Sequence, residues 1–117
     1  MPKVILVLAG GPGLPGGSPD HRYELTVTLD ANGCLDAVAW AADPAPWTAL
    51  RFRPDAPTRP GEVVHDAETG WQLRFPEGGQ EMGLPVALSS GGPLRPGAHV
   101  TLREPDGEYA YRVVSVG

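Results

Sequence analysis

The chain has 117 residues, with 16 glycines, 14 prolines and a formal net charge of −5 from 14 acidic against 9 basic residues. A chain of this length fits one domain, so we assign residues 1–117 to a single unit. The acidic balance gives no basic surface for nucleic acid or for an anionic membrane, and the single cysteine, Cys34, excludes an intrachain disulfide.

Residues 3–9 form a continuous apolar run rich in β-branched side chains, which predicts a strand buried on both faces. The run is too short to span a membrane, so we expect a cytoplasmic protein. A glycine- and proline-rich loop follows at residues 10–19. Its stretch 11–16 matches the dinucleotide pattern G-x-G-x-x-G, but Pro12 and Pro15 remove backbone donors and a strand follows in place of the required helix. We therefore expect no nucleotide cofactor.

Residues 23–29 alternate apolar and polar side chains, which predicts a strand with one buried face. An Asp-Ala-Asn-Gly turn leads to a second predicted strand, 34–40. A two-residue loop would bury Asp36, whereas a bulged turn pairs Leu29 with Leu35 and continues the strand pairing beyond them. Because an unpaired buried carboxylate costs several kcal/mol, we favour the bulged register.

In the bulged register Trp40 falls opposite Glu24, on the polar face of the hairpin. A large aromatic residue there predicts an exposed apolar contact at a partner or oligomer interface. The alternative is that Trp40 packs beneath the proline-containing loop at 43–47.

The segment from Trp47 to Arg53 predicts a strand with Leu50 and Phe52 facing inward. Three prolines then predict a loop over residues 54–61. Arg51, Arg53 and Arg59 lie close together in this region and are interpreted as solvated charges on the strand and loop.

A second hairpin is predicted by residues 62–65 and 71–75, which flank a turn at 66–70. Its alternation sets Val63 opposite Leu73, and His65 opposite Trp71 on the same face. The sequence then predicts a loop at 76–81, a short strand at 82–88 interrupted by Pro85, and a further loop at 89–97.

The last hairpin is predicted over residues 98–104 and 108–116. With Asp106 and Gly107 as a two-residue loop, Val100 faces Val113 and Leu102 faces Tyr111. This ending is similar to hairpins of small SH3-like and OB-like barrels, a resemblance that indicates a hairpin and no particular family.

Together these elements predict an all-β fold: a small antiparallel barrel or two-sheet sandwich of about seven to eight strands with Pro/Gly-rich loops. The last strand is expected to pair with the first strand or near it. No segment longer than two turns has a helical period.

The chemistry-bearing residues do not form a recognisable catalytic pattern. His21, His65 and His99 lack the H-x-H or H-x-x-x-H spacing of metal sites, so we expect no metal and no catalytic residues. The leading hypothesis is a non-catalytic binding or assembly module that presents loops or a sheet edge to a protein partner or to another copy. Its candidate binding residues are Trp40, His65 and Trp71.

The alternative hypothesis is an enzyme or small-ligand-binding barrel. Its site would lie around His65, Asp66 and Trp71, together with His21. Two histidines and a carboxylate that converge in one pocket would favour this alternative.

Overall fold

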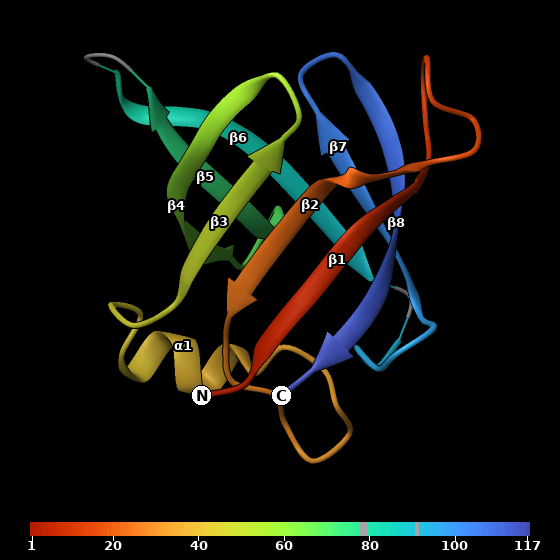
Figure 1. Ribbon diagram of the computed structural model, residues 1–117. Helices are drawn as coiled ribbons and strands as arrows, with labels where there is room; N and C mark the ends of the chain where they lie inside the picture. Colours follow the sequence, from red (N-terminus) through yellow and green to blue (C-terminus); the bar gives the residue numbers. More distant parts are fainter. Residues whose placement is uncertain (78–79, 91) are drawn as a thin grey trace.

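Eight antiparallel strands close into one barrel, with a short helix at one end (Figure 1). The computed structural model describes the backbone of residues 1–77, 80–90 and 92–117, and the side chains of these residues except 77, 80–85 and 90. In chain order the elements are β1 (Lys3–Gly10), β2 (Ser18–Thr26), α1 (Ala37–Ala42), β3 (Thr48–Arg53), β4 (Ala56–Asp66), β5 (Gly70–Glu77), β6 (Gln80–Ser90), β7 (His99–Glu104) and β8 (Gly107–Val116).

Each strand pairs with the next one in the chain, and β8 returns to pair with β1, which sets Val4 opposite Val116 and Leu6 opposite Val113. The predicted all-β fold and the pairing of the last strand with the first are therefore confirmed. Of the two predicted architectures, the barrel is correct and the sandwich is not. Every strand has a neighbour on both sides over part of its length, so the described part of the chain contains no strand with an entirely free edge.

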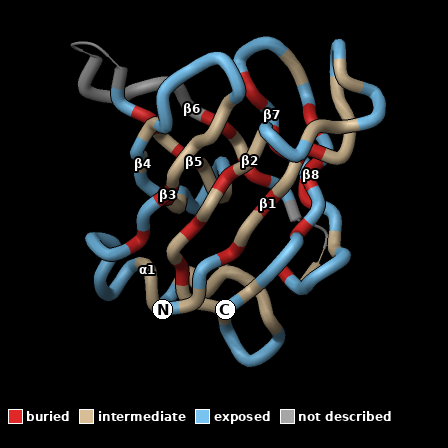
Figure 2. The backbone as a smooth tube through the Cα atoms, viewed as in Figure 1, coloured by how far each residue is buried: buried red, intermediate tan, exposed pale blue. Residues whose placement is uncertain are grey.

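The interior of the barrel is filled by alternate residues of the strands, which appear as alternating buried positions along the tube in Figure 2. In β1 the buried residues are Val4, Leu6 and Leu8, while Ile5 and Val7 are only partly buried. The prediction that residues 3–9 are buried on both faces is therefore wrong. The barrel has a single layer, and no second element among the described residues covers the outer side of β1.

Residues 37–42 form helix α1 and not the strand predicted for 34–40. The predicted pairing of Leu29 with Leu35 is present as an isolated bridge, but the chain then turns into the helix. The Asp36 carboxylate accepts a hydrogen bond of 3.0 Å from the Ala39 backbone N–H and caps the helix. Alanine is the strongest helix former, so the Ala-rich sequence continues the helix once it is capped.

The inner side of β3 is opposite to the one that the sequence predicts. Trp47 and Ala49 are each only 1% exposed, whereas Leu50 and Phe52 lie partly exposed on the outer side. The guanidinium of Arg22 covers the Phe52 ring at 4.2 Å, which shields it from water outside the barrel. By alternation Arg51 therefore faces the interior, and Arg53 follows it.

Strand β4 includes most of the segment 54–61 that is predicted as a loop. Leu50 pairs with Pro60, and Ala49 pairs with Gly61. The register between β4 and β5 begins only at Glu62, so residues 56–61 pair with β3 alone. A strand with one partner tolerates proline, because one row of its N–H groups has no partner to lose.

The hairpin β4–β5 has the predicted register, with Val63 opposite Leu73 and His65 opposite Trp71. Strand β6 is longer than predicted and continues through Pro85 to Ser90. Part of the predicted loop at 76–81 falls on residues 78–79, and part of that at 89–97 on residue 91, both outside the described residues.

The last hairpin is shifted by two residues on β8 from the predicted register. Val100 pairs with Tyr111, Leu102 with Tyr109, and Glu104 with Gly107. The two loop residues are thus Pro105 and Asp106. Proline has no N–H to give to the ladder, so the turn is more stable with Pro105 in the loop than in the strand.

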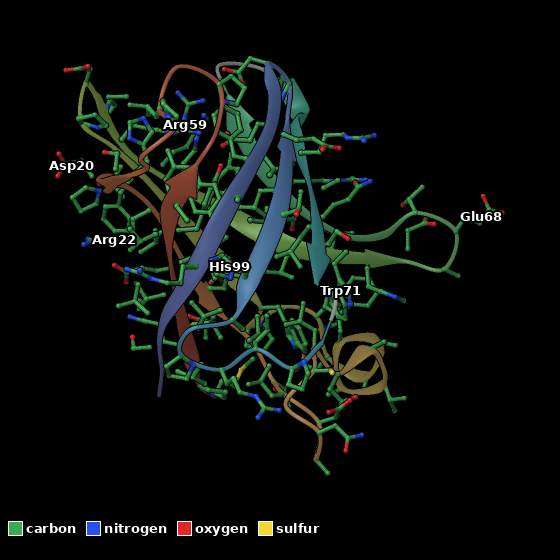
Figure 3. The ribbon with its side chains drawn as sticks, turned by 90° about the vertical axis from the view of Figure 1, so that its right-hand side faces the viewer. Asp20, Arg22, Arg59, Glu68, Trp71 and His99 are labelled. Carbon is green, nitrogen blue, oxygen red and sulfur yellow. The ribbon has the colours of Figure 1, made fainter. Side chains whose placement is uncertain are left out.

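The up-and-down topology gives the barrel two ends with different chemistry. The helix end contains α1, the start of β3 and the turn between β4 and β5. The arginine end contains the end of β3, the start of β4 and the turn between β7 and β8. Figure 3 shows Trp71 near the α1 ribbon and Arg59 at the opposite end of the barrel.

Candidate functional site

The three predicted binding residues lie together at the helix end, in a cluster of aromatic rings. The ring centroids of His65 and Trp71 are 4.6 Å apart, those of Trp40 and His65 are 6.0 Å apart, and those of Trp40 and Trp71 are 6.4 Å apart. Trp47, which the sequence places in a strand but not in the site, stacks on Trp71 at 5.3 Å with nearly parallel rings. We call Trp40, Trp47, His65 and Trp71 the aromatic cluster.

Trp40 reaches this cluster from α1 and not from a strand, so its predicted place opposite Glu24 is wrong. Its indole N–H donates a hydrogen bond of 2.9 Å to the Val63 carbonyl oxygen, which fixes the helix against β4. The ring is partly exposed and packs against the hydrophobic core. A hollow of about 390 Å³ lies beside it, lined by Trp40, Pro44, Ala45, Glu62, Val63, Val64 and Arg74.

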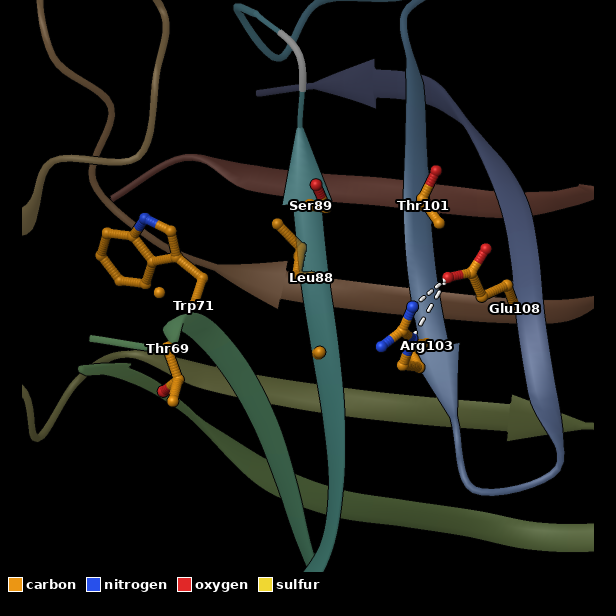
Figure 4. A pocket seen from close by; sticks show the side chains of 9 residues that line it. Thr69, Trp71, Leu88, Ser89, Thr101, Arg103 and Glu108 are labelled. Atoms are coloured by element: carbon orange, nitrogen blue, oxygen red, sulfur yellow. Dashed lines mark hydrogen bonds and ion pairs between the residues drawn. The ribbon is translucent and has the colours of Figure 1, made fainter. Parts of the chain in front are cut away.

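A second hollow of about 530 Å³ has Trp71 in its lining (Figure 4). Hydroxyl groups of Thr69, Ser89 and Thr101 border it, and an exposed ion pair between Arg103 and Glu108 closes one side. Trp71 therefore contacts the aromatic cluster with one part of its ring system and borders a polar surface with another.

Of the residues of the alternative site, Asp66 is engaged in its own turn and His21 lies on a different strand. The Asp66 carboxylate accepts hydrogen bonds from the backbone N–H groups of Glu68 at 2.7 Å and Thr69 at 3.1 Å. These bonds lower the pKa of Asp66 and engage its carboxylate with the backbone of the turn. His21 lies on β2 and His99 on β7, and no group of three or more potential metal ligands is present among the described residues.

The outer face of α1 is an unusual surface for a charged protein. All six residues of α1 are apolar and none of them is buried. Val38 is 81% exposed, and Ala41 and Ala42 are exposed beside it. The loop that follows exposes Pro44, Ala45 and Pro46. We call these six exposed residues, 38, 41, 42 and 44–46, the helix face.

The arginine end contains a buried polar cluster that the sequence analysis missed. Glu104 on β7 is 4% exposed, and its Oε1 accepts hydrogen bonds from the Tyr23 hydroxyl and from the Arg53 guanidinium. Burial and the nearby Glu104 charge raise the pKa of Tyr23 and of Tyr111 far above the usual value. Burial lowers the pKa of Arg53, but Glu104, Tyr23 and Tyr111 together raise it by more, and the net shift is upward.

The sequence contains one signal that could have revealed this cluster. Trp47, directly before β3, lies on the same side as Ala49, Arg51 and Arg53. Inward placement of this large aromatic ring puts the two arginines on the inner side as well. Strand period alone does not supply the partner, because Glu104 lies 51 residues after Arg53 in the chain.

Comparison of the chain with protein-family models, curated proteins and solved structures gave no match. No helix in the described part of the chain is long and apolar enough to cross a membrane. A β-barrel supports many unrelated activities, so the function has to be argued from the surfaces of this molecule.

Proposed function

We propose that this chain is a non-catalytic binding and assembly module that docks a protein partner on the helix face. The observation that carries the proposal is that α1 consists of apolar residues and that none of them is buried. A helix that is apolar on all sides is normally enclosed in a protein interior. An exposed apolar surface of this kind is typical of an interaction site.

The charges around the helix face define the chemistry of the partner. Asp43 and Glu62 are exposed at its border, Asp36 lies at the start of the helix, and Arg74 is the basic residue that lines the adjoining hollow. With a net charge of −5 the whole chain is also acidic. The proposed partner therefore presents an apolar surface with basic residues at its rim. The proposal includes a cytoplasmic location, which the lack of cysteine pairs supports.

Site-specific photocross-linking in the cells that express the protein tests this proposal. A photoreactive residue at position 38 should form an adduct of defined mass, because Val38 belongs to the helix face and is 81% exposed. The matched control places the same residue at position 114, since Val114 is also exposed, at 46%, but lies on β8.

The substitution Ala41→Asp should abolish the adduct at position 38 without unfolding the barrel, because Ala41 is exposed. An adduct of twice the mass of the chain would identify a second copy as the occupant. Equal adducts from positions 38 and 114, or none from position 38, would contradict the proposal.

A further inference from the structure

The hollow beside Trp71 lies on the outer side of strands β5 to β8 and is open to solvent (Figure 4). Its volume of about 530 Å³ falls within the range of roughly 300–1,000 Å³ that is typical of small-molecule sites. The strand register brings its side chains together, since Ala87 lies opposite Arg103 and Arg103 lies opposite Glu108. Thr101, Arg103 and Glu108 are exposed, so a ligand can reach them from solution.

Small residues leave the space above this part of the sheet open. Gly70 has no side chain, and nothing lies within 4 Å of the position that a Cβ would take there. Ala87 lies between the buried residues Val86 and Leu88, so its methyl group faces outward. A larger side chain at position 87 would therefore occupy the hollow without entering the core of the barrel.

Several hydrogen-bonding groups of the hollow have no partner in the described part of the chain. The exposed hydroxyls of Ser89 and Thr101 make no hydrogen bond to another described residue. Arg103 donates from both Nε and Nη2 to the same oxygen, Oε1 of Glu108. Oε2 of Glu108 can therefore accept a hydrogen bond from a ligand, and the remaining N–H groups of Arg103 can donate to one.

The charges in the hollow favour a neutral ligand. Arg103 and Glu108 are the charged residues that line it. A cationic ligand would be repelled by Arg103 and an anionic ligand by Glu108, so neither gains from the pair as a whole. Two adjacent hydroxyl groups fit both residues, because one hydroxyl can accept from the guanidinium while its neighbour donates to the carboxylate.

Trp71 gives this polar hollow an aromatic border. Its ring is partly exposed, and it stacks on the buried ring of Trp47, which holds it in place. An aromatic ring contacts the C–H groups of a ligand favourably, whereas hydroxyl and charged side chains bind its O–H groups. A sugar ring carries both kinds of group.

From these observations we infer that the hollow binds a neutral hexopyranose sugar. Arg103 and Glu108 bind two adjacent hydroxyl groups of the sugar, and its C–H groups contact Trp71. The hydroxyls of Ser89 and Thr101 bind a third hydroxyl group. No residue of the helix face lines this hollow, so the inference does not depend on the proposed protein partner.

NMR titrations with the methyl glycosides of glucose, galactose, mannose and N-acetylglucosamine test the inference. At least one of them should bind saturably with a Kd of roughly 1–10 mM, the affinity expected for a ligand with so few non-hydrogen atoms. The sugar should shift the indole N–H signal of Trp71 more than that of Trp40, because Trp40 does not line the hollow and its N–H is bonded to the Val63 carbonyl oxygen.

Two variants locate the binding site. Ala87→Leu should abolish saturable binding, because the longer side chain fills the hollow. The matched control is Ala56→Leu, which places the same side chain at an exposed position of β4 outside the hollow and should leave the Kd unchanged. Glu108→Gln removes the charge of an exposed acceptor and should raise the Kd roughly tenfold. It tests the inference even if Ala87→Leu does not fold.

Charged sugars test the preference for a neutral ligand. The methyl glycosides of glucuronic acid, which carries a carboxylate, and of glucosamine, which carries an ammonium group, should bind no more tightly than the best neutral glycoside. Three results would overturn the inference: no saturable binding of any of the four neutral glycosides, tighter binding of either charged glycoside, or an unchanged Kd in Ala87→Leu or Glu108→Gln.

Discussion

Glu104 on β7 contacts β2 and β3 through one buried carboxylate, and we expect its negative charge to stabilise the barrel. It accepts hydrogen bonds from Tyr23 on β2 and from Arg53 on β3. Glu104→Gln keeps the shape of the side chain but leaves the arginine cations without a counter-charge. We expect a loss of about 2–4 kcal/mol in the free energy of unfolding, below the value for a fully buried pair because Arg53 is partly exposed.

Urea denaturation monitored by tryptophan fluorescence measures this loss. The matched control is Glu108→Gln, which removes the carboxylate of an exposed ion pair with Arg103. An exposed pair contributes about 0–1 kcal/mol, so the control should change little. Equal losses in the two variants would show that the Glu104 charge has no special role in the interior.

The tyrosines provide a second prediction at the scale of single residues. The pKa values of Tyr23 and Tyr111 are raised by burial, and that of Tyr109 is raised by its hydrogen bond to Asp106. In the unfolded chain these groups lose their protons near pH 10, whereas in the barrel they retain them, so the unfolded state gains stability as pH rises above about 10.

Absorbance of tyrosinate during an alkaline titration should therefore stay far below the value for three tyrosines until the barrel unfolds. Loss of circular dichroism should coincide with the rise in absorbance. Gradual ionisation of all three residues near pH 10 in a folded barrel would contradict this prediction.

Among the elements, α1 depends on its cap because it is only six residues long. Asp36→Ala removes the carboxylate that accepts the Ala39 N–H, which should cost about 0.5–2 kcal/mol of stability. Asp36→Ser can still cap the helix and serves as the control. If α1 is the docking element, Asp36→Ala should also reduce the photocross-link at position 38, and equal stability of the two variants would show that the cap is dispensable.

The packing of β4 against β5 depends on Gly61. A Cβ at this position would lie 2.4 Å from the Arg74 carbonyl oxygen and 2.5 Å from the Phe75 ring. Gly61→Ala should therefore destabilise the barrel by about 1–3 kcal/mol, measured by thermal or urea unfolding. Gly16→Ala is the matched control, because nothing lies within 4 Å of a Cβ there; a similar small effect at both positions would contradict the close packing.

These elements also show what the sequence could and could not predict. The register of β4 and β5 follows from alternation and turn length, both of which are local, so His65 and Trp71 were placed together correctly. The helix was missed because the preceding turn favours a hairpin; the alanines favour a helix, and the cap formed by Asp36 decides for it.

The buried polar cluster was missed for a different reason. Hydrophobicity favours Leu50 and Phe52 as inward residues, and it opposes arginine in an interior. The inward position of the arginines on β3 is stabilised by the negative charge of Glu104 on β7. That contact forms only when the whole barrel closes. Likewise, Trp40 joins the aromatic cluster from α1. Strand pairing alone does not predict that position.

For the whole molecule, closure between β1 and β8 is the event that completes the core. Lys3 and Gly117 exchange two backbone hydrogen bonds, of 2.8 and 3.0 Å, so the ends of these two strands lie side by side at the helix end. The turn between β4 and β5 contains only exposed residues at 67–69. Because a barrel has no unique first strand, the order of synthesis of its strands should matter little for the final structure.

We therefore expect a circular permutant to fold. The permutant joins residues 117 and 1 through a short glycine- and serine-rich linker and opens the chain between Glu68 and Thr69. Its circular dichroism should match that of the original chain, with some loss of stability because the Asp66 turn is cut. A second permutant opened between Leu6 and Val7 is the control: it cuts β1 within the core and should be much less stable. Equal stability of the two permutants would contradict a barrel held closed by β1, and failure of both to fold would show that the junction of β1 and β8 cannot be bridged.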